Sequence, residues 1–175
     1  MFDKEYTFRG SHGEKVNRLT AAFDKQNNKL FDTNYRVYML APIVGFLYSV
    51  TAESQRSDEN DTKIFAGQFN NIRDDLMFNY RLIMLLDKKH EPDFEKRVDK
   101  AFRYYGSDKA KDDEARYEAF VRGGVDKLYE KIMEGALSPE DYLVNLYNFM
   151  EEIDERYNRV IDKESILDLC RLAKS

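Results

Sequence analysis

Histidine and cysteine, the side chains most often used for nucleophilic catalysis and transition-metal binding, are scarce in this sequence. They occur only as His12, His90 and Cys170. A di-iron site in a helical bundle needs two Glu-x-x-His pairs, and the nearest approach is the single spacing from Asp87 to His90. Zinc and iron–sulfur sites need several cysteine or histidine ligands. We therefore expect no metal, no cofactor and no catalytic residue.

The positions of two of these side chains favour structural roles. His90 follows a predicted helix, where a surface histidine also interacts well with the helix dipole. Cys170 lies on the apolar side of a predicted short helix, where a thiol usually acts as a small hydrophobic side chain. A catalytic alternative would require a polar pocket with a perturbed titratable group. The sequence offers only these histidines and this thiol, besides carboxylates, to build one.

A pair of adjacent glycines, Gly123-Gly124, follows Arg122 inside an otherwise helical pattern. Two glycines weaken a helix by about 2 kcal/mol relative to alanine, so they need a reason. The first interpretation is close packing against a neighbouring helix, or a break in the helix. The second is a break whose exposed amides hold a phosphate together with Arg122.

Two further groups of residues are candidates for binding a protein partner. An acidic cluster near the end of the chain contains Glu151, Glu152, Asp154 and Glu155. We interpret it as a solvated helix face that can also dock a basic partner. The second group is Tyr104-Tyr105, part of a set of 12 tyrosines that cannot all be buried cheaply, because each hydroxyl needs a hydrogen-bond partner. Exposed tyrosines are typical of interfaces.

The charge balance disfavours a dedicated nucleic-acid binder, which usually carries a basic excess. The formal net charge is −5. Residues 1–90 carry 13 basic and 12 acidic groups, whereas residues 91–175 carry 15 and 21. A modest DNA or RNA binder stays an alternative if its arginines converge on one face. The candidates for such a face are Arg36, Arg73, Arg81, Arg97, Arg103 and Arg122.

Helices are the elements that must position all of these residues. Only 8 glycines and 3 prolines occur, too few turn signals for an all-β sandwich. Apolar residues recur at helical spacing in segments separated by short connections. The expected helical segments are 14–30, 35–50, 74–86, 92–105, 117–132, 139–157 and 164–172. We predict an all-α fold, a compact single-domain bundle of about six or seven helices over residues 1–175.

Several local features refine this expectation. Residues 1–12 show no period and predict an irregular N-terminal arm, and the polar stretch 53–62 predicts a loop. The segment 35–50 is apolar on all sides and, with 74–86, is expected at the centre of the bundle. Pro42 would kink this helix or divide it in two. Residues 62–69 could form one short strand, for which no partner strand is predicted.

Two motifs resemble a known group of proteins. The stretch from Phe31 to Phe46 carries Phe-x-Thr followed by an apolar helix that ends in Gly-Phe, and Gly123-Gly124 precedes a late helix. These features resemble small accessory proteins of bacterial DNA-phosphorothioation and related anti-phage defence loci, over about a quarter of the chain. The resemblance implies an accessory subunit and no catalytic residues.

These observations predict a non-catalytic interaction or accessory subunit of a larger bacterial assembly, in a DNA-associated anti-phage defence system. Its expected partners are proteins of a multi-subunit complex, and both homo-oligomerisation and nucleic-acid contact are left open. The charged N-terminus lacks the apolar region of a signal peptide. The longest uncharged run, Val37–Ala52, is shorter than the roughly 20 residues that span a bilayer. We therefore expect no membrane association and a cytoplasmic location.

Overall fold

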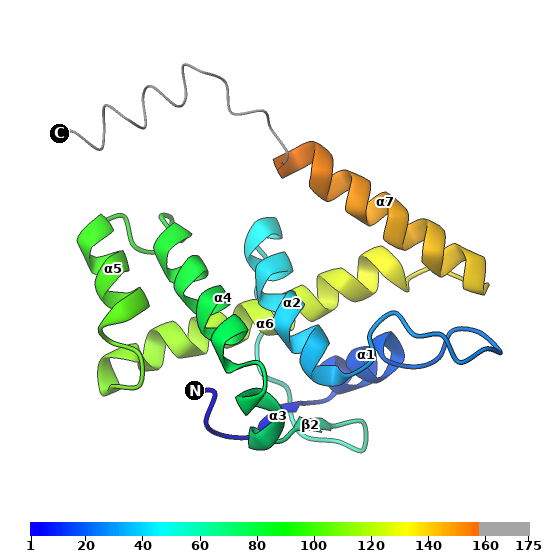
Figure 1. Cartoon of the computed structure of the whole chain (residues 1–175), viewed down its shortest axis with the longest axis horizontal. Coiled ribbons are helices and arrows are strands. Elements are labelled where there is room, and N and C mark those ends of the chain that lie inside the picture. Colours follow the sequence, from blue (N-terminus) through cyan, green and yellow to red (C-terminus); the bar gives the residue numbers. More distant parts are fainter. Residues whose placement is uncertain (158–175) are drawn as a thin grey trace.

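The computed structural model of the chain describes residues 1–157 and is mostly helical (Figure 1). This architecture confirms the all-α prediction, with one small two-stranded sheet added. The predicted helix 164–172 lies outside the described residues. In order, the elements are β1 (Tyr6–Phe8), α1 (Ser11–Leu19), α2 (Asn34–Tyr48), β2 (Thr62–Ile64), α3 (Ala66–Asn70), α4 (Arg73–Leu86), α5 (Phe94–Phe102), the 3-10 turn η1 (Asp108–Ala110), α6 (Lys111–Ile132) and α7 (Pro139–Tyr157).

Helix α6 runs along the length of the molecule, and α2 crosses it (Figure 1). Glycines make the crossing unusually close. A Cβ atom at Gly124 would overlap the carbonyl oxygen of Ala41, and one at Gly45 would overlap that of Phe120. The packing interpretation of Gly123-Gly124 is therefore right. The helix break and the phosphate site are wrong, because α6 is continuous through both glycines and their amides lie inside it.

Helix α2 is a single helix of 15 residues that contains Pro42, so the two-helix alternative is wrong. It ends at Ser49, which adopts a left-handed conformation with φ 55°. Helix α4 begins and ends close to the predicted bounds, and residues 51–57 form the predicted loop without regular structure. Within residues 1–157, no helix is both long enough and apolar enough to cross a bilayer.

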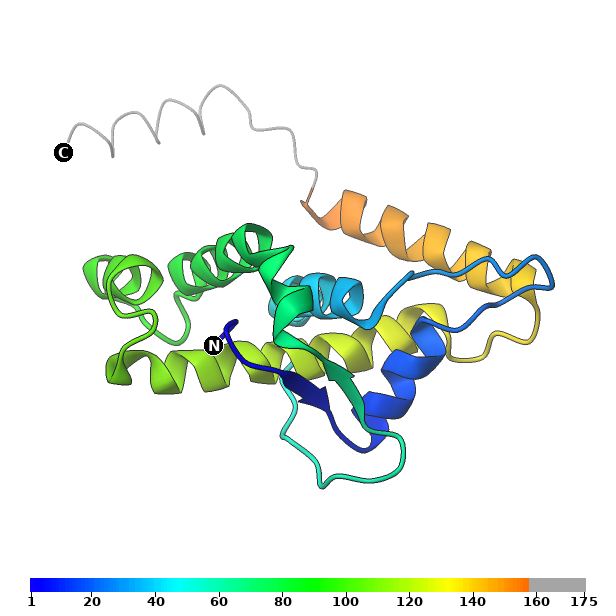
Figure 2. The ribbon, with the colours of Figure 1, turned by 60° about the horizontal axis from the view of Figure 1, so that its bottom comes forward.

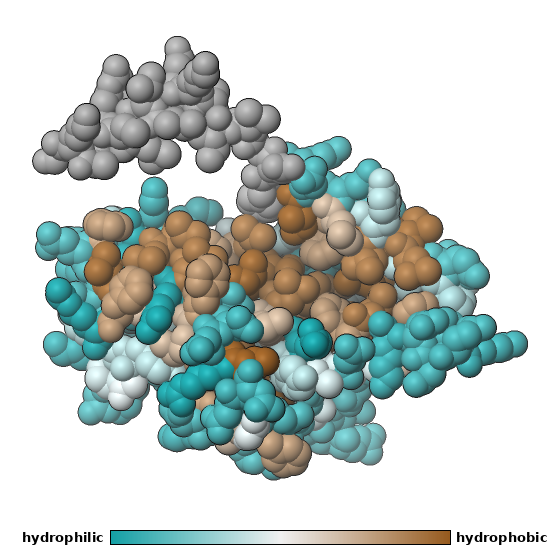
Figure 3. Space-filling model, viewed as in Figure 1, coloured by the Kyte–Doolittle hydropathy of each residue, from teal (hydrophilic) through white to brown (hydrophobic). Residues whose placement is uncertain are grey.

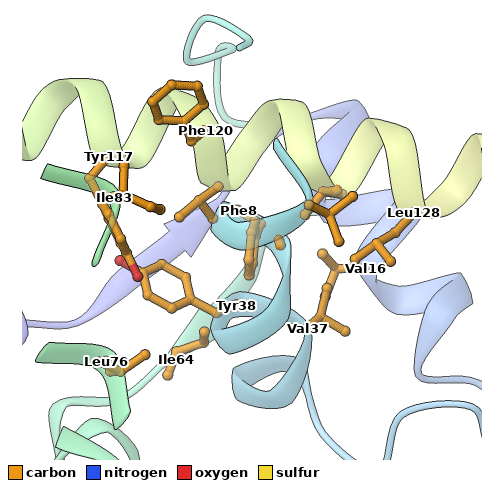
Figure 4. Close-up of a cluster of buried hydrophobic side chains, with 14 of the residues drawn as sticks. Phe8, Val16, Val37, Tyr38, Ile64, Leu76, Ile83, Tyr117, Phe120 and Leu128 are labelled. Atoms are coloured by element: carbon orange, nitrogen blue, oxygen red, sulfur yellow. The ribbon is translucent and has the colours of Figure 1, made fainter. Parts of the chain in front are cut away.

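The hydrophobic core lies between α6, α2, α4 and the first strand (Figure 4). Tyr38 of α2 and Tyr117 of α6 are fully buried in it. Phe2 is also fully buried, with its ring 5.8 Å from that of Tyr117. The expectation of an irregular arm over residues 1–12 is therefore wrong: this segment supplies core side chains, forms β1 and enters α1.

Strand β1 is the partner that the sequence did not predict for the 62–69 segment. The two strands pair antiparallel, with Tyr6 opposite Ile64 and Phe8 opposite Thr62. Figure 2 shows them side by side beneath α6, next to the 51–61 loop. Each strand has only three residues, too few for an alternating pattern to stand out.

Several helix bounds differ from the prediction. Helix α6 begins at Lys111, in the charged segment before the predicted start at 117. Helix α1 ends at Leu19 instead of continuing to Leu30, and in the segment that follows Asp24 accepts the backbone N–H of Asn28 (2.9 Å) and closes a turn. Helix α5 begins at Phe94, not at Pro92, because the Asp93 carboxylate caps it by accepting the N–H of Lys96. Ser138 caps α7 as predicted.

Candidate functional site

The side of α2 that faces away from α6 is apolar and open to solvent. Leu40 and Ile43 lie on it at helical spacing, and Leu40 is 38% exposed. A helix that is apolar on all sides is normally enclosed by other elements. Within residues 1–157, α2 packs against α6, α4, α1 and β2, but its Leu40 side is left open. This open side is the floor of the candidate site.

Helix α4 forms one wall. Phe78 is 64% exposed and, together with Met39, Leu40 and Ile43, lines a groove of about 350 Å³ between α4 and α2. On its other side, Phe78 lines a larger groove of about 660 Å³ between α4 and α5, where Phe102 is also exposed. An exposed phenylalanine is thus shared by two adjoining apolar grooves.

Helix α7 forms the opposite wall. Its spacing places Leu143, Tyr147 and Met150 on one side, and all three are at least half exposed. The residues that face the core are Tyr142, Leu146, Phe149 and Ile153. The apolar residues cover a wider arc of α7 than the core needs.

Figure 3 shows that hydrophobic residues form a nearly continuous surface over α4, α2 and α7. We call this surface the apolar face, represented by Leu40, Ile43, Phe78, Leu143 and Met150. A contiguous exposed patch of this kind is typical of interaction sites. It is the most prominent feature of the described residues that the fold itself does not require.

The acidic residues predicted to bind a partner lie on α7 beside the apolar face. Glu151 accepts a hydrogen bond from the Tyr147 hydroxyl (2.7 Å), and Glu155 is exposed. Glu152 instead pairs with Lys131 (2.6 Å) and Arg156 (2.9 Å). The hydrogen bond from Lys131 holds the pKa of Glu152 below its usual value. Glu151 and Glu155 therefore remain as an acidic rim, and Glu152 fastens α7 to α6.

The predicted tyrosine pair is structural. The Tyr105 ring stacks on Phe2 at 6.0 Å, and its hydroxyl accepts the backbone N–H of Phe2. Tyr104 donates its hydroxyl to Asp99 at 3.2 Å. The structure thus does not bring these two side chains together as an exposed aromatic patch.

The six candidate arginines do not converge on one face. Arg97 is buried and donates to the carbonyl oxygens of Leu85, Glu91 and Pro92, which fixes the turn between α4 and α5. Arg122 donates to the carbonyl oxygen of Ala52. Arg36 of α2 pairs with Asp32, which precedes that helix, and Arg103, which follows α5, pairs with Asp99 of α5.

Arg73 and Arg81 are the two candidates that line a common groove, between α4 and α5. Arg73 pairs with Asp3, and the Arg81 guanidinium lies 5.3 Å from the centre of the Phe102 ring. This arrangement is too small and too mixed in charge to track a phosphate backbone, which requires several converging cations.

A second, polar site lies on the side of α6 that carries β1 and α1. Tyr6, His12, Glu118 and Arg122 line a pocket of about 300 Å³. Burial raises the pKa of Glu118, against the lowering effect of the Arg122 charge. Burial also raises the pKa of Tyr6 to about 12, so its hydroxyl stays neutral. The sequence missed this site because its residues come from three distant segments.

His12 is the most buried titratable residue of this pocket, at 2% exposure. Its Nε2 lies 3.4 Å from Asp126, and its Nδ1 has no hydrogen-bond partner. Burial tends to raise the pKa of Asp126, but hydrogen bonds from His12 and Lys15 outweigh it and lower the pKa. Within residues 1–157, no serine, threonine or cysteine side chain hydrogen-bonds to His12, although Thr7 and Ser54 also line the pocket.

The remaining residues considered for catalysis or metal binding are His90 and Cys170. His90 is exposed after α4, as predicted, where its backbone N–H donates to Asp87. Cys170 lies outside the described residues. Within residues 1–157, no three histidine, cysteine or carboxylate side chains gather as a metal site would require.

No model of a known protein family, no curated protein and no solved structure matches this chain.

Proposed function

We propose that this chain is a non-catalytic interaction subunit that binds an amphipathic helix of a protein partner on its apolar face. The observation that carries the proposal is the open side of α2. Among residues 1–157, no element covers the apolar side of this central helix between its two walls, α4 and α7, and Leu40 and Phe78 are exposed. This arrangement is the helix-in-groove mode of recognition, in which anchors at helical spacing enter an apolar groove.

The floor fits a helix in length. Helix α2 has 15 residues, which corresponds to about 22 Å. A partner helix of about three to four turns would cover it, with anchors at spacings of three and four residues entering beside Leu40 and Ile43. Burial of one large apolar side chain contributes about 1.5 to 3 kcal/mol, so a few such anchors are sufficient for specific binding.

The rim indicates the charge of the partner. Glu151 and Glu155 stand exposed on α7 next to the apolar face. A partner helix with lysine or arginine along the edge that meets α7 would complement them. Rim charges act more on the association rate and on specificity than on affinity.

The setting that we propose, an accessory subunit within a bacterial anti-phage defence assembly, is supported by the resemblance of residues 31–46 and Gly123-Gly124 to such proteins. In this fold Phe31 and Phe46 pack against the core and the glycines form the α2–α6 contact. The motif residues therefore build the scaffold that holds the apolar face.

The test is affinity capture from the native host with the full chain, with and without nuclease, and mapping of the minimal fragment of any partner. The variant Leu40→Glu places a charge on the floor, and Glu59→Lys, in the exposed 51–61 loop, is the matched control. We expect a stoichiometric partner that survives nuclease, is lost with Leu40→Glu and is kept with Glu59→Lys. Its minimal fragment should be a basic-edged amphipathic helix.

Two outcomes contradict the proposal. Binding that Leu40→Glu leaves intact would place the partner elsewhere on the molecule. Recovery of nucleic acid alone, lost on nuclease treatment or at moderate salt, would instead favour the arginine-based binder, because phosphate contacts weaken steeply with salt.

A further inference from the structure

We infer that two copies of this chain associate through the outer side of α4, with their α4 helices packed antiparallel about a two-fold axis near Phe78. The surface involved is the groove between α4 and α5. This inference goes beyond the proposed function, because a helix of another protein would instead bind on the floor formed by α2. The second copy contributes its own α4 to the groove, so the contact is the same seen from either copy.

Large apolar side chains are exposed on this side of the molecule. Phe78 of α4 and Phe102 of α5 are each more than half exposed. Met77 and Leu82 line the same groove, where Figure 3 shows hydrophobic residues over α4 and α5. Aromatic residues and methionine are enriched in protein interfaces. This side of α4 is therefore suited to bury another surface.

Two charged residues flank Phe78 on this side of α4. Asp74 precedes Phe78 by four residues and Arg81 follows it by three, so the three side chains share one side of the helix. Neither Asp74 nor Arg81 forms an ion pair with any residue of the described range 1–157. The Arg81 guanidinium lies over the Phe102 ring, 5.3 Å from its centre, and such stacking leaves its edge N–H groups available to a carboxylate.

The order of these side chains is self-complementary. Asp74 and Arg81 are equally distant along α4 from the midpoint between Met77 and Phe78. A two-fold axis through that midpoint places Asp74 of each copy opposite Arg81 of the other, with the Phe78 rings meeting at the axis. A parallel pair of helices would instead bring like charges together, which is unfavourable. The charge pattern therefore selects an antiparallel second copy as the occupant of the groove.

The size of this surface predicts a reversible dimer. Helix α4 has 14 residues and is about 21 Å long. Each copy would bury one side of it together with the adjoining Phe102, which is at the low end of specific interfaces that bury roughly 1,200 to 2,000 Å² in total. We therefore expect dimers at high protein concentration. Because the two ion pairs lie near solvent, added salt should weaken the association.

Reversal of charge tests the pairing of Asp74 with Arg81. Asp74→Arg makes both positions positive and Arg81→Asp makes both negative, so either variant alone places like charges opposite each other. A mixture of the two variants restores opposite charges at both contacts. The matched controls are Glu59→Arg and Arg56→Asp, which make the same charge changes in the exposed 51–61 loop. The readout is sedimentation velocity of the full chain over a concentration series at low salt.

We expect the parent and both controls to dimerise, and each α4 variant to weaken dimerisation at least about ten-fold, because like charges meet twice across the axis. The mixture should recover the dimer, which also shows that both variants are folded. A parent that stays monomeric at every concentration would overturn the inference. A dimer that is insensitive to both charge reversals would also overturn it. So would a monomeric parent that captures a different protein through Asp74 and Arg81.

The inference and the proposed function fail separately. Leu40→Glu, on the α2 floor, should abolish capture of a helical partner and leave self-association intact. Asp74→Arg should do the reverse. Loss of the dimer with Leu40→Glu would place the second copy on the floor and overturn the inference, whereas the failure of the proposed function is the absence of a helical partner in the capture experiment.

Discussion

The two sides of α2 have similar hydropathy, but one is packed against another helix and the other is exposed. One side lies against α6 so closely that Gly45 and Gly124 have no room for a side chain. The other side carries Leu40 and Ile43 and, within residues 1–157, is left open between α4 and α7. Hydropathy is the same on both, because the helix is apolar all round. What separates them is side-chain size: the side held in permanent contact has glycine and alanine, and the open side has large aliphatic residues.

This difference distinguishes a structural contact from an exchangeable one. Small residues bring two backbones together and leave no space for another element. Large residues such as Leu40 and Phe78 leave apolar surface and grooves that a different helix can enter. Four predictions test this difference between the two sides of α2, beginning with the largest expected loss of stability.

Gly124→Ala should destabilise the protein by about 3 kcal/mol, because the new methyl group overlaps the carbonyl oxygen of Ala41 and forces α2 and α6 apart. The matched control is Gly67→Ala in α3, where nothing lies near the added Cβ atom. There, alanine should be neutral or stabilising by up to about 1 kcal/mol. Urea unfolding of the two variants measures both. Equal effects would show that the glycine contact is loose.

Val44→Ala should cost about 2 kcal/mol, since Val44 is buried and the substitution leaves a cavity. Leu40→Ala, one turn away on the open side, removes more atoms but should cost less than about 1 kcal/mol of global stability. The comparison is made by thermal unfolding of both variants. If Leu40→Ala lowers stability more than Val44→Ala does, the distinction between a packed and an open side of α2 is wrong.

Asp126→Asn should cost about 1 kcal/mol at neutral pH, because the Asp126 carboxylate on α6 accepts hydrogen bonds from His12 and Lys15 of α1. The pKa of Asp126 is lowered in the folded state. Its contribution is therefore present above the unfolded pKa of about 3.8 and is lost as the pH falls through the lower folded value. Unfolding measured from pH 7 downwards should show the variant and the parent converge in acid. A cost that does not change with pH would contradict this account.

Asn79→Ala should have the smallest effect, about 0.5 kcal/mol. The Asn79 amide donates to the carbonyl oxygen of Met39 at 2.8 Å and ties α4 to the open side of α2. Its loss should loosen the groove wall locally, so hydrogen exchange in α4 should accelerate more than global stability falls. Uniform acceleration across α4 and α6 would mean that the groove is not an independent unit.

The helical composition of the fold could be predicted because α2, α4, α6 and α7 carry long apolar patterns and clear caps such as Ser138. The paired strands could not, because three residues give no period and the partner of Thr62–Ile64 lies more than fifty residues earlier. The close α2–α6 contact was foreseen at Gly123-Gly124. Its second half, Gly45, was read only as part of a motif.

The candidate site was harder to predict than the fold. Periodicity shows that Leu143, Tyr147 and Met150 share a side of α7, but not whether anything packs against that side. Both Glu152 and Tyr105 were expected at an interface, yet each is held by contacts inside the fold. The polar pocket around His12 depends on residues brought together from β1, α1 and α6, which spacing along the chain cannot reveal.

The burial of Phe2 has a consequence during synthesis on the ribosome, because Phe2 is made well before the residues that bury it. The backbone N–H of Phe2 donates to the Tyr105 hydroxyl, 103 residues further along the chain, and its ring packs on Tyr117. A chain elongates at about 5 to 20 residues per second. Phe2 therefore emerges on the order of 10 s before the aromatic residues that enclose it. During that interval the segment around Phe2 presents unshielded aromatic residues, so chaperones that bind such segments should engage it there and release it only once α6 has been made.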